Sequence, residues 1–370
     1  IPFCRKACVY CDFHFSTSLR QKDAMLQALQ REIQLRNDLG PTAPTIESIY
    51  FGGGTPSVLS ANEIRLLIDE ITQKYPVASH AEITLEANPD DLDQAYLTSL
   101  AQTPINRLSI GVQSFDESVL QAMNRSHNQQ QAISAVKMAQ DQGFHNITID
   151  LIFAIPQQIT SIFEENLTQA LSLGVPHMAV YALTIEEKTA LAHQVKTGKV
   201  RPAEDQVYET EFTLAHEVLT AHGFDHYELS NYAQPGAHAV HNGNYWKGVS
   251  YLGIGPSAHS YHEGVRSWNK AHNARYIQAL QQDQLAVEDQ ETLTQADRYH
   301  EYIMTHLRKK EGIDPDWIRT YGIENWDLKY DGYIQQWISQ GLMQKVEGKY
   351  ACTPQGWLVS DHMISELFLD

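Results

Sequence analysis

Three cysteines near the start of the chain are the residues best suited to carry chemistry. Cys4, Cys8 and Cys11 form a C-x3-C-x2-C run, and the chain holds four cysteines in all. An odd cluster of three cannot pair internally, and four cysteines in 370 residues do not make a disulfide scaffold. Soft thiolates this close together are typical ligands of zinc or of an iron–sulfur cluster.

Two metal groups fit these cysteines. Structural zinc needs four ligands, and His14, three residues after Cys11, could be the fourth. However, no second C-x2-C or H-x3-H pair follows, and a first gap of three residues is unusual for zinc. Three thiolates on a 4Fe-4S cluster leave one iron open, which suits chemistry at the cluster. The spacing therefore favours the cluster over zinc.

The elements that must position these cysteines alternate between strand and helix. Strands are predicted at residues 46–51, 82–87, 107–112, 146–152, 177–181 and 226–229. Helices are predicted at 23–36 (ending before Gly40-Pro41), after a capping box of Ser60 and Glu63, and at 91–100, 129–142, 161–173 and 204–221. This alternation is typical of parallel βα units, and six repeats are too few for an eight-fold barrel. We therefore expect an α/β fold, a partial (β/α)6 TIM-like barrel with its chemistry where strands end.

The amino-acid composition changes after the last predicted barrel strand. Gly, His, Tyr and Trp gather between residues 230 and 269, and helical periodicity disappears there. Helical segments return at 298–309, 315–321 and 330–340, followed by a hairpin at 342–353 around Gly348. We expect three parts: a barrel at 1–230, a connecting segment at 231–285, and a smaller, mainly helical, winged-helix-like domain at 286–370.

The charge balance excludes several classes of partner. Lys and Arg total 27 and Asp and Glu 45, giving a net charge of −18. That balance argues against binding to a phosphate backbone and against a polybasic membrane anchor. No apolar run approaches the ~18 residues of a transmembrane helix, so at most a peripheral membrane contact is expected. We expect a cytosolic protein with no nucleic-acid partner, and because the chain starts at Ile1 we expect residues to precede it.

A glycine run, taken together with the cysteines, indicates a resemblance to a known family. Gly52-Gly53-Gly54-Thr55-Pro56 follows the first predicted strand, and together with the cysteine run it resembles the radical S-adenosylmethionine (SAM) superfamily. Further matches are Glu86-Ala87-Asn88-Pro89, the segment RLSIGVQSF at 107–115, and Asp150-Leu151-Ile152. With these segments, nearly the whole chain resembles the oxygen-independent coproporphyrinogen III oxidase family.

This resemblance implies two cofactors and a set of binding residues. Cys4, Cys8 and Cys11 would hold a 4Fe-4S cluster, and the methionine part of SAM would chelate the fourth iron. The backbone of Gly52, Gly53, Gly54 and Thr55 would face the amino group of SAM. Glu86, Gln113 and Asp150 would bind its amino or ribose hydroxyl groups, Arg125 its carboxylate, and Tyr10 would lie near its adenine. Without the cysteines, Glu86 and Asp150 would be interpreted as helix caps or salt bridges at the barrel rim.

Two features select a branch of this family. The decarboxylating enzymes carry a fourth cysteine two residues past the third, where this chain has Phe13. Phe13 is typical of the HemW-type heme chaperones, and His241-Asn242-Gly243-Asn244-Tyr245-Trp246 resembles their H-N-x-x-Y-W motif. His241 is the candidate heme ligand, with His238 and His259 as alternatives. The alternative for His241 is that it only orders its own loop.

The branch decides between two functions. The first is a heme chaperone, monomer or dimer, that binds the cluster, SAM and one heme and passes the heme to an acceptor protein, for example of the respiratory chain. The second is an oxygen-independent coproporphyrinogen III oxidase, which generates a 5′-deoxyadenosyl radical in porphyrin biosynthesis. Phe13 favours the chaperone, so whether the chain is an enzyme stays open and no catalytic residue is assigned. A structural zinc protein is the third interpretation.

One segment departs from the family pattern. Where the family tends to have Gly-Leu-Pro-Gly-Gln, this chain has Ala154-Ile155-Pro156-Gln157-Gln158. Two lost glycines remove backbone freedom beside the expected adenosine site. The detailed contacts there are therefore in doubt, although the family is not.

Overall fold

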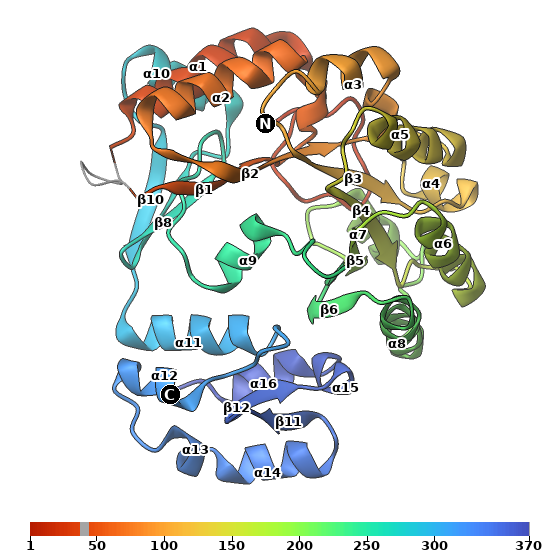
Figure 1. Ribbon diagram of the computed structural model, residues 1–370, viewed down its shortest axis with the longest axis vertical. Helices are drawn as coiled ribbons and strands as arrows, with labels where there is room; N and C mark the ends of the chain where they lie inside the picture. The colour runs from red at the N-terminus through yellow and green to blue at the C-terminus, as the bar shows by residue number, and fades with distance from the viewer. Residues whose placement is uncertain (38–43, 370) are drawn as a thin grey trace.

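A curved seven-stranded sheet forms the larger part of the computed structural model, which describes residues 1–37 and 44–369 (Figure 1). Its strands are β1 (Ile46–Phe51), β2 (Val77–Ala87), β3 (Arg107–Gln113), β4 (Ile147–Phe153), β5 (His177–Ala182), β6 (Asp225–Glu228) and β7 (Asn231–Ala233). They lie in the order β1-β2-β3-β4-β5-β7-β6, and β1 to β5 are parallel. This is the expected partial barrel.

The edge of the sheet differs from the sequence prediction. The short strand β7 inserts between β5 and β6 and pairs antiparallel with both. It has three residues and follows β6 after only two, so it is too short to show an alternating pattern of its own. The other six strands lie within a few residues of their predicted positions, except that β2 begins five residues earlier, at Val77 rather than at residue 82.

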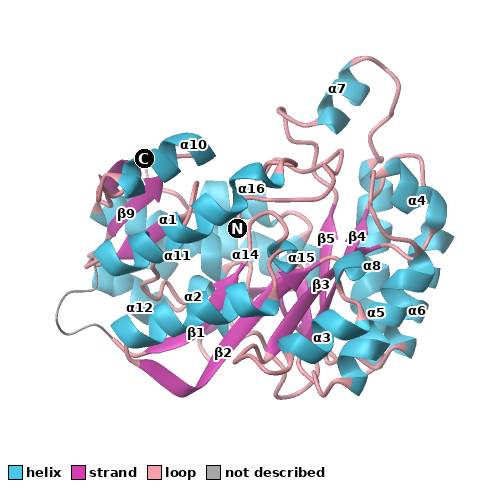
Figure 2. Cartoon of the chain, turned by 90° about the horizontal axis from the view of Figure 1, so that it is seen from above, coloured by secondary structure: helices cyan, strands magenta, loops and turns pink. Residues whose placement is uncertain are grey.

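Helices cover the outer face of this sheet, as Figure 2 shows for α3, α5 and α6. The helices of this part are α1 (Lys22–Leu35), α2 (Ala61–Lys74), α3 (Gln94–Leu100), α4 (Glu117–Ala122), α5 (Gln129–Asp141), α6 (Thr160–Ser172), α7 (Ala190–Lys196) and α8 (Asp205–Ala221). The described residues also form four short 3-10 helices: η1 (Leu19–Gln21), η2 (Pro56–Val58), η3 (Pro89–Asp91) and η4 (Arg319–Tyr321). Nearly every residue of β3 and β4 is buried, as expected for parallel strands covered on both faces. The Gly40-Pro41 pair predicted to follow the first helix lies outside the described residues.

The segment between the barrel and the C-terminal region contains more regular structure than its sequence indicates. It holds the helices α9 (Val240–Trp246) and α10 (Asn273–Gln281) and the antiparallel strands β8 (His259–His262), β9 (Val265–Asn269) and β10 (Val287–Thr292). The absence of helical periodicity predicted for 230–269 is wrong at α9. That helix spans two turns, which is too short for a clear period.

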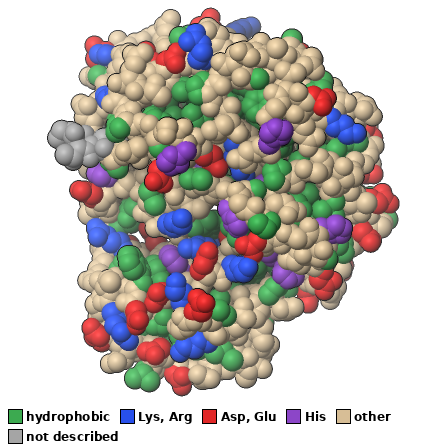
Figure 3. All heavy atoms as spheres, in the orientation of Figure 1, with side chains coloured by type: hydrophobic (Ala, Val, Ile, Leu, Met, Phe, Trp, Pro, Cys, Tyr) green, Lys and Arg blue, Asp and Glu red, His purple; other side chains and the backbone are tan. Residues whose placement is uncertain are grey.

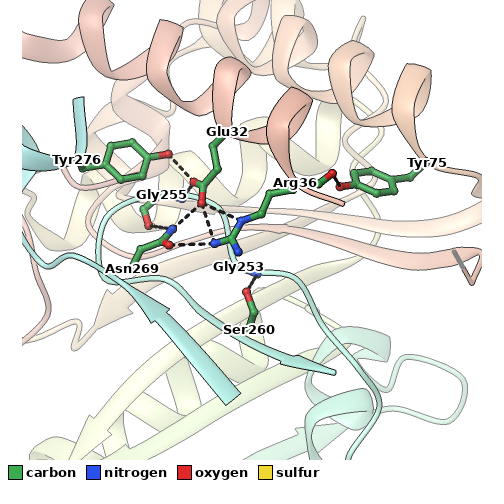
Figure 4. Close-up of polar contacts among 8 residues, drawn as sticks. All are labelled: Glu32, Arg36, Tyr75, Gly253, Gly255, Ser260, Asn269 and Tyr276. Atoms are coloured by element: carbon green, nitrogen blue, oxygen red, sulfur yellow. Dashed lines mark hydrogen bonds and ion pairs between the residues drawn. The ribbon is translucent and has the colours of Figure 1, made fainter. Parts of the chain in front are cut away.

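A buried ion pair joins this segment to the barrel (Figure 4). Glu32 lies on the last turn of α1 and Arg36 directly follows the helix. Both side chains are fully buried, and Arg36 Nη2 donates to Glu32 Oε1 at 2.9 Å. The Asn269 amide bonds both partners, and Tyr276 on α10 and the Gly255 backbone donate to Glu32 Oε2. A buried carboxylate needs such a set of donors to offset its lost hydration.

The C-terminal region lies below the sheet in Figure 1 and is mainly helical. Its elements are α11 (Gln295–His306), α12 (Pro315–Ile318), α13 (Trp326–Lys329), α14 (Asp331–Ser339), β11 (Met343–Val346), β12 (Lys349–Cys352), α15 (Pro354–Trp357) and α16 (Ser360–Glu366). The three predicted helices and the hairpin are present. The first helix begins at Gln295, three residues before the predicted start, because Thr294 and Asp297 form a capping box there.

No helix among residues 1–37 and 44–369 is long and apolar enough to cross a membrane.

Candidate cofactor site

The glycine run holds the cysteine loop against the end of β1. Gly54 donates its backbone N–H to the Ile1 carbonyl at 2.9 Å, and Thr55 donates to the Phe3 carbonyl at 2.7 Å. A Cβ on Gly54 would lie 2.7 Å from the Phe3 carbonyl oxygen, so a larger residue would push the two segments apart. The first residues of the chain are thereby fixed beside the sheet.

The three cysteines lie on one short loop, and polar donors point at two of their sulfurs. Thr55 Oγ1 donates to Cys4 Sγ at 3.3 Å, and Arg125 Nη1 donates to Cys8 Sγ at 3.2 Å. Burial raises the pKa of the Cys4 thiol, and it raises the pKa of Cys11 to about 11. Hydrogen bonds to sulfur favour the thiolate, which is the form that binds iron.

The zinc alternative loses its fourth ligand. His14 Nε2 lies 2.8 Å from Asn273 Oδ1 on α10, so its ring is engaged away from the cysteines. In the part of the chain that the structure describes, no three His, Cys, Asp or Glu side chains, the three cysteines included, are grouped so that they could hold a metal ion.

Two half-buried carboxylates lie on nearby strands: Glu86 is the second-last residue of β2, and Asp150 lies in the middle of β4. Glu86 on β2 accepts from the Tyr50 hydroxyl at 2.7 Å, and Asp150 on β4 accepts from Ser109 Oγ at 3.1 Å. Burial raises the pKa of both, that of Asp150 to about 7, and the nearby Glu86 charge raises the pKa of Asp150 further. Neither is an N-cap, and neither makes a salt bridge within the described chain. A cationic ligand would relieve this repulsion, which fits the ammonium and sulfonium groups of SAM.

Arg125 connects the carboxylates' side of the site to the cysteines. Its Nη2 donates to Asn88 Oδ1 at 2.7 Å and to the Gly111 carbonyl at 2.6 Å, and its Nε is buried without a partner among the described residues. Gln113, at the end of β3, adopts a left-handed φ of 67°, which is uncommon for a side-chain-bearing residue. Tyr10 packs against the apolar cluster of Val119, Met123, Ile152 and Ile155. These residues therefore meet where β1 to β4 end, and an unpaired guanidinium N–H there suits a carboxylate ligand.

The candidate heme ligand His241 lies behind this site. Its ring stacks on Tyr50 with centroids 4.6 Å apart, and its Nδ1 is 2.9 Å from Ser48 Oγ. The backbone N–H groups of Val240 and His241 donate to Glu82. Burial lowers the pKa of His241 to about 4, so the imidazole is neutral at pH 7 with no hydrogen bond to Nε2 among the described residues.

The two alternative histidines lie in different settings. His238 Nε2 is 3.1 Å from Asp225 Oδ2, so that nitrogen is engaged. His259 on β8 is exposed and stacks on Trp268 at 6.0 Å.

Sequence reasoning missed Tyr50 and gave no role to Asn88. Tyr50 bonds Glu86 and stacks on His241, so it joins the carboxylates to the H-N-x-x-Y-W segment. The available signal was the alternation of β1, in which Ser48 and Tyr50 share one face of the strand.

The departure at residues 154–158 keeps the backbone that glycine would allow. Ala154 has a φ of 53° and Gln157 a φ of 63°, so both positions where the family tends to have glycine are left-handed here. Glu211 Oε2 accepts from the Ala154 backbone N–H at 2.7 Å and holds this turn. Ala154 and Gln157 therefore carry backbone strain that glycine at these positions would not.

Phe13, the residue that replaces a fourth cysteine, is 67% exposed. Its position on the surface next to the cysteine loop gives it no packing role in the core.

Residues 1–168, which hold the cysteine loop and the strands β1 to β4, match the family model of the radical SAM superfamily. Coproporphyrinogen III oxidase (HemN) from Escherichia coli has the same fold, with a TM-score of 0.84 over 100% of this chain and 88% of that chain at 22% identity. The superfamily implies a 4Fe-4S cluster and SAM, and the thiols, glycines and half-buried carboxylates described above fit both.

Full-length relatives carry the relationship further. The heme chaperone HemW of Lactococcus lactis is 32% identical over 100% of this chain and 96% of its own length. HemW of Bacillus subtilis is 32% identical over 98% of this chain and 96% of its length, and HemW of Escherichia coli is 32% identical over 100% and 96%. The chain belongs to the HemW family.

Proposed function

We propose that this chain is a heme chaperone that binds a 4Fe-4S cluster, SAM and one heme and transfers the heme to an acceptor protein. The observation that carries the proposal is the relationship to proteins named heme chaperone HemW over the full length of the chain. Phe13 in place of a fourth cysteine supports it against the decarboxylase alternative. The proposal places the protein in the cytoplasm, with an acceptor that is a protein and not a nucleic acid.

Within this proposal the chain's own residues hold the two cofactors. Cys4, Cys8 and Cys11 bind the cluster as thiolates, and the Thr55 and Arg125 donors stabilise that negative charge. Glu86, Asp150 and Gln113 bind the amino or ribose hydroxyl groups of SAM. The backbone of Gly53 and Gly54 faces its amino group. Arg125 binds its carboxylate, and Tyr10 covers the adenine. When bound, the cluster and SAM supply one-electron chemistry.

Heme binding is proposed beside α9, the helix of the H-N-x-x-Y-W segment. Neutral imidazole is the form of histidine that ligates heme iron, and the low pKa of His241 keeps it neutral, which makes it one candidate ligand. Tyr245 meets the His241 ring edge-on at 5.0 Å and is 46% exposed, so an aromatic surface lies open next to this histidine. Flat aromatic walls suit a porphyrin.

The test combines a hemin titration with a cluster assay. The anaerobically reconstituted native protein is titrated with hemin while the Soret band is followed, and saturation near one hemin per chain is expected. Cys8→Ala is expected to lose the iron and its absorbance near 400 nm but to keep the far-ultraviolet circular dichroism of the folded barrel. Cys352→Ala, which removes a buried thiol distant in sequence from the loop, is the control that keeps its iron.

Two results would contradict the proposal. Weak hemin binding that does not saturate in the native protein would return the chain to the decarboxylase alternative. Full iron retention in Cys8→Ala would exclude the cysteine run as the cluster site.

A further inference from the structure

A cavity of about 710 Å³ lies between the connecting segment and the C-terminal region, away from the cysteines. Its volume falls within the ~300–1,000 Å³ of typical small-molecule sites. Tyr245 and Trp246 of α9 line one side, and residues of α11 and the loop after it line another. Figure 3 shows a hollow at this level of the molecule, with Lys, Arg, Asp and Glu side chains around it.

The cavity combines flat aromatic surface with unpaired positive charge. Tyr251, Tyr261 and Tyr321 belong to its lining, and so does Trp317, which is 56% exposed. Lys247, Lys309 and Arg298 also line it, and none of the three forms an ion pair in the described chain. Five basic residues against three acidic ones in the lining contrast with the excess of acid in the whole chain. A flat apolar ligand that carries carboxylates would match both properties.

A histidine in this lining is arranged to ligate a metal. His306, at the end of α11, places Nδ1 2.9 Å from the Tyr302 carbonyl, which can only accept, so Nδ1 carries the proton and Nε2 the lone pair. Metal-binding histidines are commonly fixed by such a hydrogen bond from the second nitrogen. Tyr302 also stacks on the ring at 3.8 Å. Burial lowers the pKa of His306 to about 4, so it is neutral at pH 7.

By contrast, His241 does not line this cavity. Its ring lies between Tyr50 of the barrel and the edge of Tyr245, and Tyr245 is the residue that reaches the cavity. The H-N-x-x-Y-W segment therefore presents its aromatic end to the cavity and its histidine to the barrel.

We infer that this cavity is the heme site, with His306 as the axial ligand and Lys247 and Lys309 as partners of the heme propionates. This inference rests on the proposed heme-chaperone function and assigns the iron to the C-terminal region. His241 is then a positioning residue that holds Tyr245 from behind. The Tyr50 hydroxyl donates to Glu86, and the Tyr50 ring stacks on His241. A row of contacting side chains therefore connects the proposed SAM site to the proposed heme site.

The experiment separates iron ligation from propionate binding by using hemin and metal-free protoporphyrin IX on the full chain. His306→Ala is expected to shift the Soret band and weaken hemin binding at least about tenfold, while protoporphyrin IX binds as in the native protein. His306→Met is expected to restore binding with a changed Soret position. The control is His300→Ala on the same helix, where the ring stacks on Phe368 outside the cavity.

The lysines are tested by the double variant Lys247→Gln/Lys309→Gln. It is expected to weaken both hemin and protoporphyrin IX, and to spare hemin dimethyl ester, whose propionates carry no charge. The control is Lys137→Gln/Lys188→Gln, which removes the same charge from exposed positions elsewhere.

The outcomes are distinguishable. If the native protein binds hemin and His306→Ala keeps both its affinity and its spectrum, the cavity assignment is wrong while the proposed function stands. If His241→Ala instead loses the axial signature, the iron lies at the barrel side of α9. If the native protein binds no hemin, the proposed function itself fails.

Discussion

At the scale of single residues, the carboxylates Glu86 and Asp150 lower the stability of the ligand-free protein and are expected to bind SAM. Asp150→Asn is expected to stabilise the ligand-free protein at pH 8 by on the order of 2 kcal/mol, because it removes a desolvated charge that Glu86 repels. Glu86→Gln is expected to stabilise it too, because it removes a desolvated charge. Each is also expected to lose SAM affinity. Urea unfolding of the ligand-free chain and calorimetric SAM titration of the reconstituted protein measure the two effects.

The pH dependence of this effect has a fixed sign. Asp150 has a folded pKa of about 7, above its usual value, so the native state binds the extra proton between about pH 4 and pH 7. Stability from this group is therefore present at low pH and is lost as the pH rises through 7. The gain of Asp150→Asn should shrink toward pH 5, and an equal gain at both pH values would contradict the charge argument.

Gln157 offers a test of backbone strain at an exposed position. Its left-handed φ of 63° costs a side-chain-bearing residue about 1–2 kcal/mol, and glycine gives back part of that gain through its freer unfolded state. Gln157→Gly is expected to raise the free energy of unfolding by about 0.5–1 kcal/mol. The neighbouring Gln158→Gly, at a position without positive φ, should lower it, and the same sign at both sites would remove strain as the cause.

At the scale of elements, the buried pair at the end of α1 fixes the connecting segment to the barrel. Glu32→Ala is expected to cost about 3–5 kcal/mol, because it leaves the Arg36 charge and the Asn269 amide without their carboxylate. Urea unfolding measures the loss. Arg31→Ala is the matched control, since it breaks an exposed pair with Asp283 between the same two parts and should cost less than about 1 kcal/mol. Equal costs would mean that the buried network contributes no more than a surface pair.

Long periodic elements were predictable from sequence, and short ones were not. Strand β1 was located to the residue, because its β-branched and aromatic residues run directly into the glycines that end it. α9 and β7, with seven and three residues, carry too few positions to show a period, and tertiary contacts decide their form. The cysteines were named from their spacing, and the carboxylates from the resemblance of their motifs to those of a known family. His306 could not be named, because only the tertiary fold shows that the end of α11 lines a cavity.

At the scale of the whole molecule, His226 lies in the contact between the barrel and the C-terminal region. Its ring stacks on Tyr232 at 3.9 Å and meets Trp357 of α15 at 4.5 Å, and Trp357 in turn donates to the Leu307 carbonyl. Burial lowers the pKa of His226 to about 3, with His216 close by and Asp225 and Lys310 also acting on it. The ring is therefore neutral in the folded protein at any mildly acidic pH.

The low pKa of His226 predicts that acid weakens this contact. The unfolded chain binds a proton at this histidine near pH 6.5 and the native chain does not until about pH 3, so stability falls as the pH drops below about 6.5. One such group contributes a slope of at most about 1.4 kcal/mol per pH unit. His226→Gln should reduce the slope between pH 6 and pH 4.5 by about this amount, measured by urea unfolding, whereas His80→Gln, at an exposed position on β2, should leave it unchanged. If both variants keep the native dependence of the unfolding free energy on pH, protonation of His226 does not weaken the contact between the barrel and the C-terminal region. The loss of stability in acid would then come from the other buried histidines.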